Sequence, residues 1–203
     1  MIEKDRLMAI TDGIVAIAAT IMVMQLVVPD EPTVDGLMTQ LPTVVAYMIS
    51  YIQVFLAWHE HHDAFADAVS ANHRIMFINA LWLFFLTMLP FATALVGKHP
   101  ESQFAEFIFI SVLLGFNLSI KAECSAIEKL NDIHMRDRAY ILKLQKINLI
   151  GCGAALIAAF IYPVASLGII IAVDIISVFI ICTYDKKLEP VIKEKIRKRK
   201  EEQ

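Results

Sequence analysis

Long apolar stretches separated by short polar segments dominate this chain and predict helices that cross a membrane. The first stretch runs from Leu7 to Val28, the second from about Leu37 to Trp58, the third from Ile75 to Val96 and the fourth from Phe104 to Ile120. A membrane-spanning helix needs roughly 20 mostly apolar residues, and each stretch is close to that length or exceeds it. The pattern therefore predicts an all-α, polytopic membrane protein.

The last apolar block, Ile147 to Thr183, is too long for one span and is divided by Tyr162-Pro163. Two helices in a tight hairpin fit this block, so the whole chain is expected to form six transmembrane helices. Pro90 interrupts the third stretch. A kink rather than a break is expected there, because neighbouring groups in a membrane protein can satisfy the carbonyl that a proline frees. Glu106 lies near the start of the fourth stretch and is expected close to a membrane interface.

Composition agrees with the pattern and divides the chain into two parts. Hydrophobic residues make up 58% of the 203 residues, above the roughly half-apolar usage of soluble domains. We expect one transmembrane domain over residues 1–185 and a basic cytoplasmic tail over 186–203, which holds 8 of the 18 Lys and Arg residues. This tail is either a solvated helical extension or a segment attracted to anionic lipid. The three scattered cysteines suggest neither a disulfide framework nor a thiolate metal site.

The placement of basic residues predicts the orientation of the spans. If the N-terminus is cytoplasmic, one side of the membrane collects Lys4, Arg6, Arg74, the basic residues within 121–146 and the tail. The other side receives only Lys98. Because Lys and Arg accumulate in cytoplasmic loops, we expect both termini in the cytoplasm of a cell-membrane protein.

The first stretch contains a recognisable motif. It reads Arg6-Leu7-Met8-Ala9-Ile10-Thr11-Asp12-Gly13, followed by Ala16-Ile17-Ala18, Thr20 and Val28-Pro29. This resembles the first-helix signature of the transmembrane-protein-175 potassium channels, Arg-x-x-x-Phe-Ser-Asp before an apolar helix. Ile10 and Thr11 replace the usual Phe and Ser, so the hydroxyl is kept and the ring is lost. The resemblance extends to Trp58 with His61-His62 and to Leu89-Pro90-Phe91; beyond about Gly97 it rests on hydropathy.

The resemblance implies a potassium-permeable cation channel without a backbone-carbonyl selectivity filter, and the chain has no Thr-Val-Gly-Tyr-Gly segment. A single six-helix repeat of the prokaryotic kind would have to form a homotetramer around a central pore in the lipid bilayer.

The resemblance places the constriction at Ile17, with Thr20 one turn outward and Met24 beyond it. It implies no cofactor and no enzymatic activity, with potassium as the permeating ion and other monovalent cations left open. A small secondary ion transporter with the same span count is the alternative. The chain has no nucleic-acid motif.

The helical spacing of the first stretch can also be read without the family. At 100° per residue, one stripe of about 80° holds five uncharged residues: Ile10, Gly13, Ile17, Thr20 and Met24. In a symmetric oligomer, a ring of branched apolar side chains can dewet and gate ions. Ordinary helix packing would give the same stripe, because a membrane helix is apolar on every face.

Asp12 needs partners elsewhere in the protein. It lies about one and a half turns beyond Arg6 and on a different face, so the two are not expected to pair directly. An unpaired carboxylate inside a membrane helix is costly, so Asp12 should meet another helix or a water-filled vestibule. We expect a structural polar network that anchors the first helix, drawn from these residues: Arg6, Thr11, Asp12, His59, His61, His62 and Asn79. A direct role for Asp12 in the permeation path is the alternative, and the histidine that pairs with it is left open.

Two further polar features carry weaker expectations. The segment His59-Glu60-His61-His62-Asp63 lacks the second histidine of a His-Glu-x-x-His zinc motif, so no metal site is expected. Asp174 stands inside the last span without an identifiable partner. Ionisable residues at such depth are hypotheses for function, and a structural and a functional role both remain open for Asp174.

Overall fold

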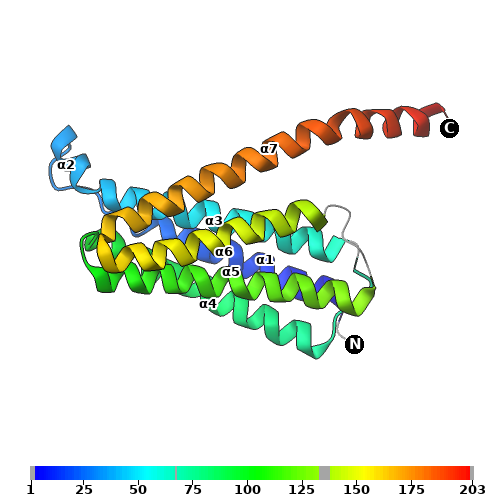
Figure 1. Cartoon of the computed structure of the whole chain (residues 1–203), viewed down its shortest axis with the longest axis horizontal. Helices are drawn as coiled ribbons and strands as arrows, with labels where there is room; N and C mark the ends of the chain where they lie inside the picture. The colour runs from blue at the N-terminus through cyan, green and yellow to red at the C-terminus, as the bar shows by residue number, and fades with distance from the viewer. Residues whose placement is uncertain (1–2, 67, 133–137, 202–203) are drawn as a thin grey trace.

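The computed structural model of the chain is a bundle of long helices (Figure 1). It describes residues 3–66, 68–132 and 138–201, and for 138–139 and 185–201 the description extends to the backbone alone. These residues form, in order, α1 (Lys4–Val23), α2 (Val34–Thr39), α3 (Leu41–Ala66), α4 (His73–Lys98), α5 (Gln103–Asn131), α6 (Arg138–Ile161) and α7 (Pro163–Glu201). No β-strand occurs among the described residues. The fold is all-α, as predicted.

Six of the described helices, all except the short α2, are long and apolar enough to cross a membrane. Their candidate spans follow the predicted order, and the last two are separated at Tyr162, as expected. α4 continues without interruption through Pro90. The chain is therefore a multi-pass membrane protein, and the prediction of six spans is confirmed.

The first span is shorter than the sequence suggested, because α1 ends at Val23 rather than at Val28. The backbone N–H of Met24 bonds to the Ile21 carbonyl at 3.2 Å, and the next two residues make similar contacts three residues back. Val27 and Val28 are β-branched, and the residue before a proline avoids the α conformation. The helix therefore unwinds before it reaches Pro29.

Two other helices run beyond the apolar stretches that predicted them. α3 continues past Trp58 to Ala66, so the histidines lie within a helix and not at its end. The reason is that residues at helical spacing continue the buried face beyond Trp58: Glu60, His61, Ala64 and Phe65. α5 similarly passes Ile120 and ends at Asn131, with Asp132 in the left-handed conformation at φ 49°.

The packing order leaves α1 on the outside of the bundle. α4 packs against α1, α3 and α5, while α6 and α7 pair with each other. Large buried side chains, including Trp82, Leu86, Phe109 and Phe116, fill the interior. α1 rests on α3 and α4, so one of its faces is left uncovered by the residues that the structure describes.

The two ends of the bundle carry different segments (Figure 1). The starts of α1, α4 and α6 lie at one end, here called the N-terminal end. The far end holds α2, the α4–α5 connection and the α6–α7 turn. α7 continues as one helix to Glu201, past the expected boundary at residue 185, and reaches beyond the bundle. The side chains of the expected tail lie outside the described residues, so the division into 1–185 and 186–203 stays a prediction.

Candidate functional site

The uncharged stripe of α1 faces away from the bundle. Ile10 and Ile17 are each 59% exposed and Met24 is 77% exposed, and Gly13 and Thr20 are exposed as well. The opposite face of α1 is buried through four residues: Leu7, Thr11, Ala18 and Met22. The stripe is therefore free to meet water, lipid or a helix from another subunit.

Local geometry distinguishes members of this stripe. The Thr20 hydroxyl donates to the Ile17 carbonyl at 2.8 Å, which fixes the side chain and leaves its oxygen accessible. A Cβ placed on Gly13 would meet nothing within 4 Å. Met24 is the C-cap residue of α1 and so lies just beyond the helix that was expected to carry it.

Grooves flank α1 on both sides. On the α4 side, a groove of about 800 Å³ includes Arg6, Ile10 and Asn79 in its lining. A second groove between α1 and α4, of about 560 Å³, is lined in part by Ile17 and Pro90. On the α3 side, a smaller groove of about 330 Å³ includes Asp12 and Trp58. Much of the surface beside α1 is therefore hollow and largely apolar.

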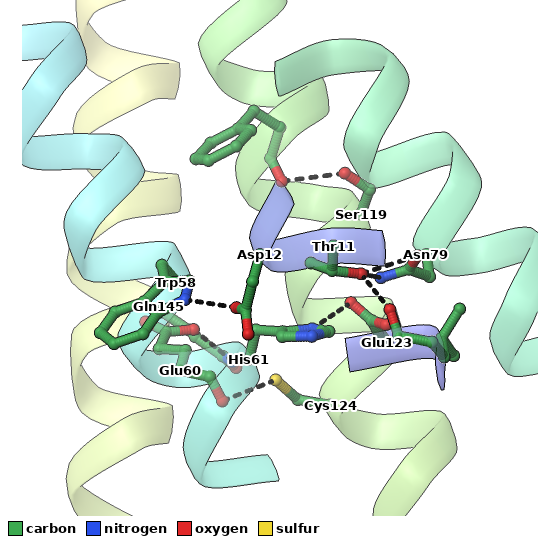
Figure 2. A network of polar contacts seen from close by, with 12 residues as sticks. Thr11, Asp12, Trp58, Glu60, His61, Asn79, Ser119, Glu123, Cys124 and Gln145 are labelled. Atoms are coloured by element: carbon green, nitrogen blue, oxygen red, sulfur yellow. Dashed lines mark hydrogen bonds and ion pairs between the residues drawn. The ribbon is translucent and has the colours of Figure 1, made fainter. Parts of the chain in front are cut away.

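Two consecutive residues attach α1 to two different helices. Asn79 on α4 donates its amide N–H to the Thr11 hydroxyl at 3.1 Å, and both side chains are buried. Trp58 on α3 donates its indole N–H to the Asp12 carboxylate at 2.8 Å. Figure 2 shows the Thr11 and Asp12 side chains pointing to these separate partners. The partner that sequence reasoning missed for Asp12 is thus an indole and not a histidine.

The three histidines make separate contacts. His61 is buried, and its Nδ1 atom lies 3.3 Å from Oε2 of Glu123. The His61 ring also stacks on Trp82. His59 Nδ1 lies 3.2 Å from the carboxylate of Asp63. The His62 ring stacks on Trp58, the donor to Asp12.

Arg6 stands apart from these contacts. Its side chain is exposed and makes no hydrogen bond or ion pair with the described residues, although it lines the groove that also includes Asn79. Apart from Arg6, the residues expected to form one network therefore make several separate contacts.

Sequence reasoning missed the buried carboxylates that lie near these histidines. Glu60 accepts a hydrogen bond from the Gln145 amide at 2.9 Å, and Glu123 approaches His61 (Figure 2). Both carboxylates are buried. The sequence did contain a signal for them, because the helical spacing of the buried faces of α3 and α5 continues beyond the apolar stretches and includes these polar residues. Hydropathy alone does not detect such spacing.

A second group of polar side chains, here called the central polar cluster, lies midway along the helices: Gln53, Asn117, Asn148, Asp174 and Ser177, from α3, α5, α6 and α7. Gln53 is its hub. Its amide N–H group donates to Asn148 at 3.2 Å and to Asp174 at 2.5 Å, and its carbonyl accepts from Asn117 at 3.0 Å.

These contacts give Asp174 the partner that the sequence did not reveal. Two buried atoms in the cluster, Asp174 Oδ2 and Ser177 Oγ, have no hydrogen-bond partner among the described residues. The cluster therefore joins four helices, and its polar groups are only partly satisfied.

Glu106 is buried near the start of its helix. It lies in the first turn of α5, where the sequence placed it, but its side chain is 0% exposed and accepts a hydrogen bond from Ser166 on α7 at 2.5 Å. The start of α7 covers it. Within the part of the chain that the structure describes, no three His, Cys, Asp or Glu side chains are grouped to hold a metal ion.

Comparisons with known proteins agree with the motif. Residues 6–90 match the family model described as "Endosomal/lysosomal potassium channel TMEM175". A curated protein of Chryseobacterium sp. (strain P1-3), named as a potassium channel, is 29% identical over 199 residues, which cover 94% of this chain and 98% of that protein. A protein of the same description from Chamaesiphon minutus is 31% identical over 121 residues, 55% of this chain and 60% of its own length.

More distant relatives and a solved structure extend the comparison. The human endosomal/lysosomal proton channel TMEM175 is 29% identical over 134 residues, and the match covers 26% of its length and 59% of this chain. The crystal structure of a lysosomal potassium-selective channel TMEM175 homolog from Chamaesiphon minutus superposes with a TM-score of 0.73. That match covers 86% of this chain and 96% of the other at 24% identity, which shows a common fold.

The motif, the fold and the similar proteins all indicate the same family. The matched family is one of ion channels and not of enzymes. The relative from Chryseobacterium has almost the same extent as this chain, as expected for a single six-helix repeat. The chain resembles the prokaryotic members of the TMEM175 family, in the family motif over residues 6–90 and in its six-helix fold.

Proposed function

We propose that this protein is a potassium-permeable cation channel. Bacterial relatives named as potassium channels support this, and one of them aligns over 98% of its length. The position of α1 assigns residues to this function. α1 bears the family motif, and its uncharged stripe is exposed on the outside of the bundle.

The exposed stripe favours an oligomer with α1 at its centre. α1 is the least buried of the six candidate spans among the described residues. One chain supplies only one such helix, and a pore requires a closed ring, so we assign a homotetramer with closed symmetry. The grooves beside α1 would then receive apolar side chains of a neighbouring subunit.

Ile17 is assigned to the constriction of this pore. In a ring, its branched side chains would narrow the path without offering oxygen ligands, and such a constriction excludes ions by dewetting. Thr20, one turn away, keeps an accessible hydroxyl oxygen that can contact a partly dehydrated potassium ion. Ile10, Gly13 and Met24 would line the remainder of the path. No segment of this path requires a backbone-carbonyl filter.

The N-terminal end of the bundle is assigned to the cytoplasm of a cell-membrane protein. Lys4, Arg6, Arg74 and Lys129 belong to this end, whereas Lys98 belongs to the far end. Basic residues accumulate on the cytoplasmic side of membrane proteins. Both termini are therefore cytoplasmic in this proposal, with the basic tail carried by the part of α7 beyond residue 185.

Ion flux in reconstituted liposomes tests the proposed function. The purified protein should produce potassium currents whose reversal potential follows the potassium gradient more closely than the sodium gradient. Unitary current steps are expected in a planar bilayer, because a channel conducts many ions in each opening. Steady exchange without unitary steps would indicate a secondary transporter, and equal fluxes with empty liposomes would refute both.

Crosslinking tests the arrangement of subunits. A Met24→Cys variant in a Cys182→Ser background should form disulfide-linked dimers in the membrane, since the α1 ends would meet around the axis. Replacing Cys182 removes the exposed native thiol, and the other two cysteines are buried. A Val69→Cys variant in the same background is the control, because Val69 is exposed in the α3–α4 connection, at the opposite end of the bundle from Met24. An active protein that is monomeric in lipid would rule out the tetramer.

A further inference from the structure

A groove between α4 and α5 lies at the N-terminal end of the bundle, apart from α1. Its volume is about 520 Å³. α4 contributes Arg74, Ile75 and Ile78 from its first turns, and Asn72 is its N-cap. The groove is hollow because the facing part of α5 presents small side chains: Ala122, Ser125 and Ala126.

The mouth of the groove is basic, and no carboxylate in the described part of the chain pairs with its charges. Arg74 and Lys129 line it with exposed side chains, and neither makes a hydrogen bond or ion pair with any described residue. No carboxylate is among the described residues that line the groove. Two cationic side chains around one groove, both without a partner in the described ranges, favour an anion at this position.

Uncharged polar groups add to the recognition of an anion. Asn72 uses its side-chain oxygen to cap α4, bonding to the Ile75 backbone N–H at 2.9 Å. Its amide nitrogen is left to donate to a ligand. Ser125 supplies a hydroxyl from the opposite wall. The groove thus has donors on both sides.

The position along the spans identifies the kind of anion. Arg74 stands at the start of α4 and Lys129 near the end of α5, where spanning helices meet the polar headgroups. Toward the bundle centre the lining becomes apolar, through Ile75, Ile78, Ala122 and Ala126. A phosphate at the mouth with a hydrocarbon chain along this apolar wall matches the groove in both chemistry and depth.

We propose that this groove binds an anionic phospholipid, with the headgroup phosphate between Arg74 and Lys129 and an acyl chain along the α4–α5 wall. Basic pockets between transmembrane helices bind anionic lipid headgroups in this way. A zwitterionic lipid brings its own cation and is bound less tightly. A free phosphate would use the mouth alone and gain nothing from the apolar wall.

Thermal unfolding of the delipidated protein in detergent tests this site without depending on ion flux. Added phosphatidylglycerol should raise the unfolding midpoint by several degrees, and phosphatidylcholine or glycerol phosphate at equal concentration should raise it by less than half as much. The double variant Arg74→Gln with Lys129→Gln should lose most of the phosphatidylglycerol shift. Arg74→Lys with Lys129→Arg keeps the charges and should retain it. Lys98→Gln, at the other end of α4, is the matched control and should behave as the wild type.

Three outcomes would overturn the proposal. An undiminished phosphatidylglycerol shift in the double Gln variant would mean that the lipid binds elsewhere. An equal shift with glycerol phosphate would assign the groove to free phosphate. If the double Gln variant loses its oligomeric state before any lipid is added, a neighbouring subunit covers the groove instead. Because none of these readouts is a current, they stand apart from the outcome of the flux experiments.

Discussion

Trp58 on α3 donates its indole N–H to the carboxylate of Asp12 on α1 across 2.8 Å. The preceding residue, Thr11, is bonded to Asn79 on α4. Consecutive residues in a helix point about 100° apart, so these two contacts hold α1 against two helices at once. Together they fix the rotation of α1 about its axis and therefore the direction in which Ile17 and Thr20 face.

Replacing Trp58 should loosen α1 more than replacing Asp12 by its amide. Trp58→Phe removes the N–H donor and leaves the Asp12 carboxylate without this partner, at a cost of about 1 kcal/mol for a partly exposed hydrogen bond. Asp12→Asn keeps an oxygen that can accept the indole N–H, so its effect on stability should be smaller. Thermal unfolding of the purified variants measures both.

The same pair of variants separates a structural role of Asp12 from a role in permeation. If Asp12→Asn retains wild-type stability but changes the preference for potassium over sodium, Asp12 contributes to the ion path. If Trp58→Phe and Asp12→Asn destabilise the protein equally, the loss of the indole donor has no effect of its own. The hydrogen bond between Trp58 and Asp12 then does not anchor α1.

Two glycines should respond in opposite ways to an added methyl group. A Cβ on Gly97 would lie 2.7 Å from the Thr43 backbone Cα, where α3 and α4 approach closely. Gly97→Ala should therefore destabilise the subunit by about 1–3 kcal/mol. Gly13→Ala should leave stability unchanged or slightly improved, since nothing lies near its Cβ and alanine favours helix.

Unitary conductance shows whether Gly13, unlike Gly97, lines the ion path. In the proposed tetramer, four added methyl groups at Gly13 narrow the path, so Gly13→Ala should lower the unitary current without unfolding the protein. A Gly13→Ala channel with normal current would place this residue outside the ion path. Equal stability of Gly97→Ala and the wild type would contradict the close approach of α3 and α4.

Gln53 should be the most sensitive polar residue of α3. Gln53→Leu removes the donor to Asn148 and Asp174 and the acceptor for Asn117 in one step. Each buried group left unsatisfied costs about 1–3 kcal/mol, so the variant is expected to lose roughly 3 kcal/mol or more. Gln40→Leu is the matched control, because the one side-chain hydrogen bond that Gln40 makes with the described residues goes to its neighbour Thr39 at the end of the bundle. A Gln53→Leu protein as stable as the control would show that the central polar cluster does not hold the helices together.

The sequence predicted the helical architecture because long apolar stretches have few alternatives in a membrane. It erred at helix ends: α1 stops before Val28, and α3 and α5 continue past Trp58 and Ile120. Hydropathy registers the apolar part of a span, whereas helix ends depend on backbone preferences and on buried polar residues. Glu60 and Glu123 are buried in the parts of α3 and α5 that lie beyond the apolar stretches.

Pairings between helices were the less predictable part. Thr11 and Asn79 were both expected in a network, but the partner of Asp12 is Trp58, and Gln53 joins Asp174 from 121 residues away. Such pairings depend on the rotation of each helix and on which helices are neighbours. Neither quantity is encoded in the periodicity of a single span, since a membrane helix is apolar around its whole circumference.

The central claim is that Ile17 on α1 forms the constriction of the pore. Ile17→Asn should hydrate the ring and so raise the current and weaken the discrimination between potassium and sodium. Ile17→Ala should mainly raise the current. Thr20→Val removes a hydroxyl and keeps the volume, so it should alter potassium preference with less effect on closure. General damage to packing would lower the current in all three variants.

The most direct measurement is the reversal potential and unitary conductance of Ile17→Asn in liposomes with opposed potassium and sodium gradients, using protein shown to be folded and tetrameric. The account predicts a larger conductance and a reversal potential shifted toward that of a non-selective pore. Unchanged conductance together with an unchanged reversal potential would contradict it, and the exposed stripe of α1 would then be a packing face.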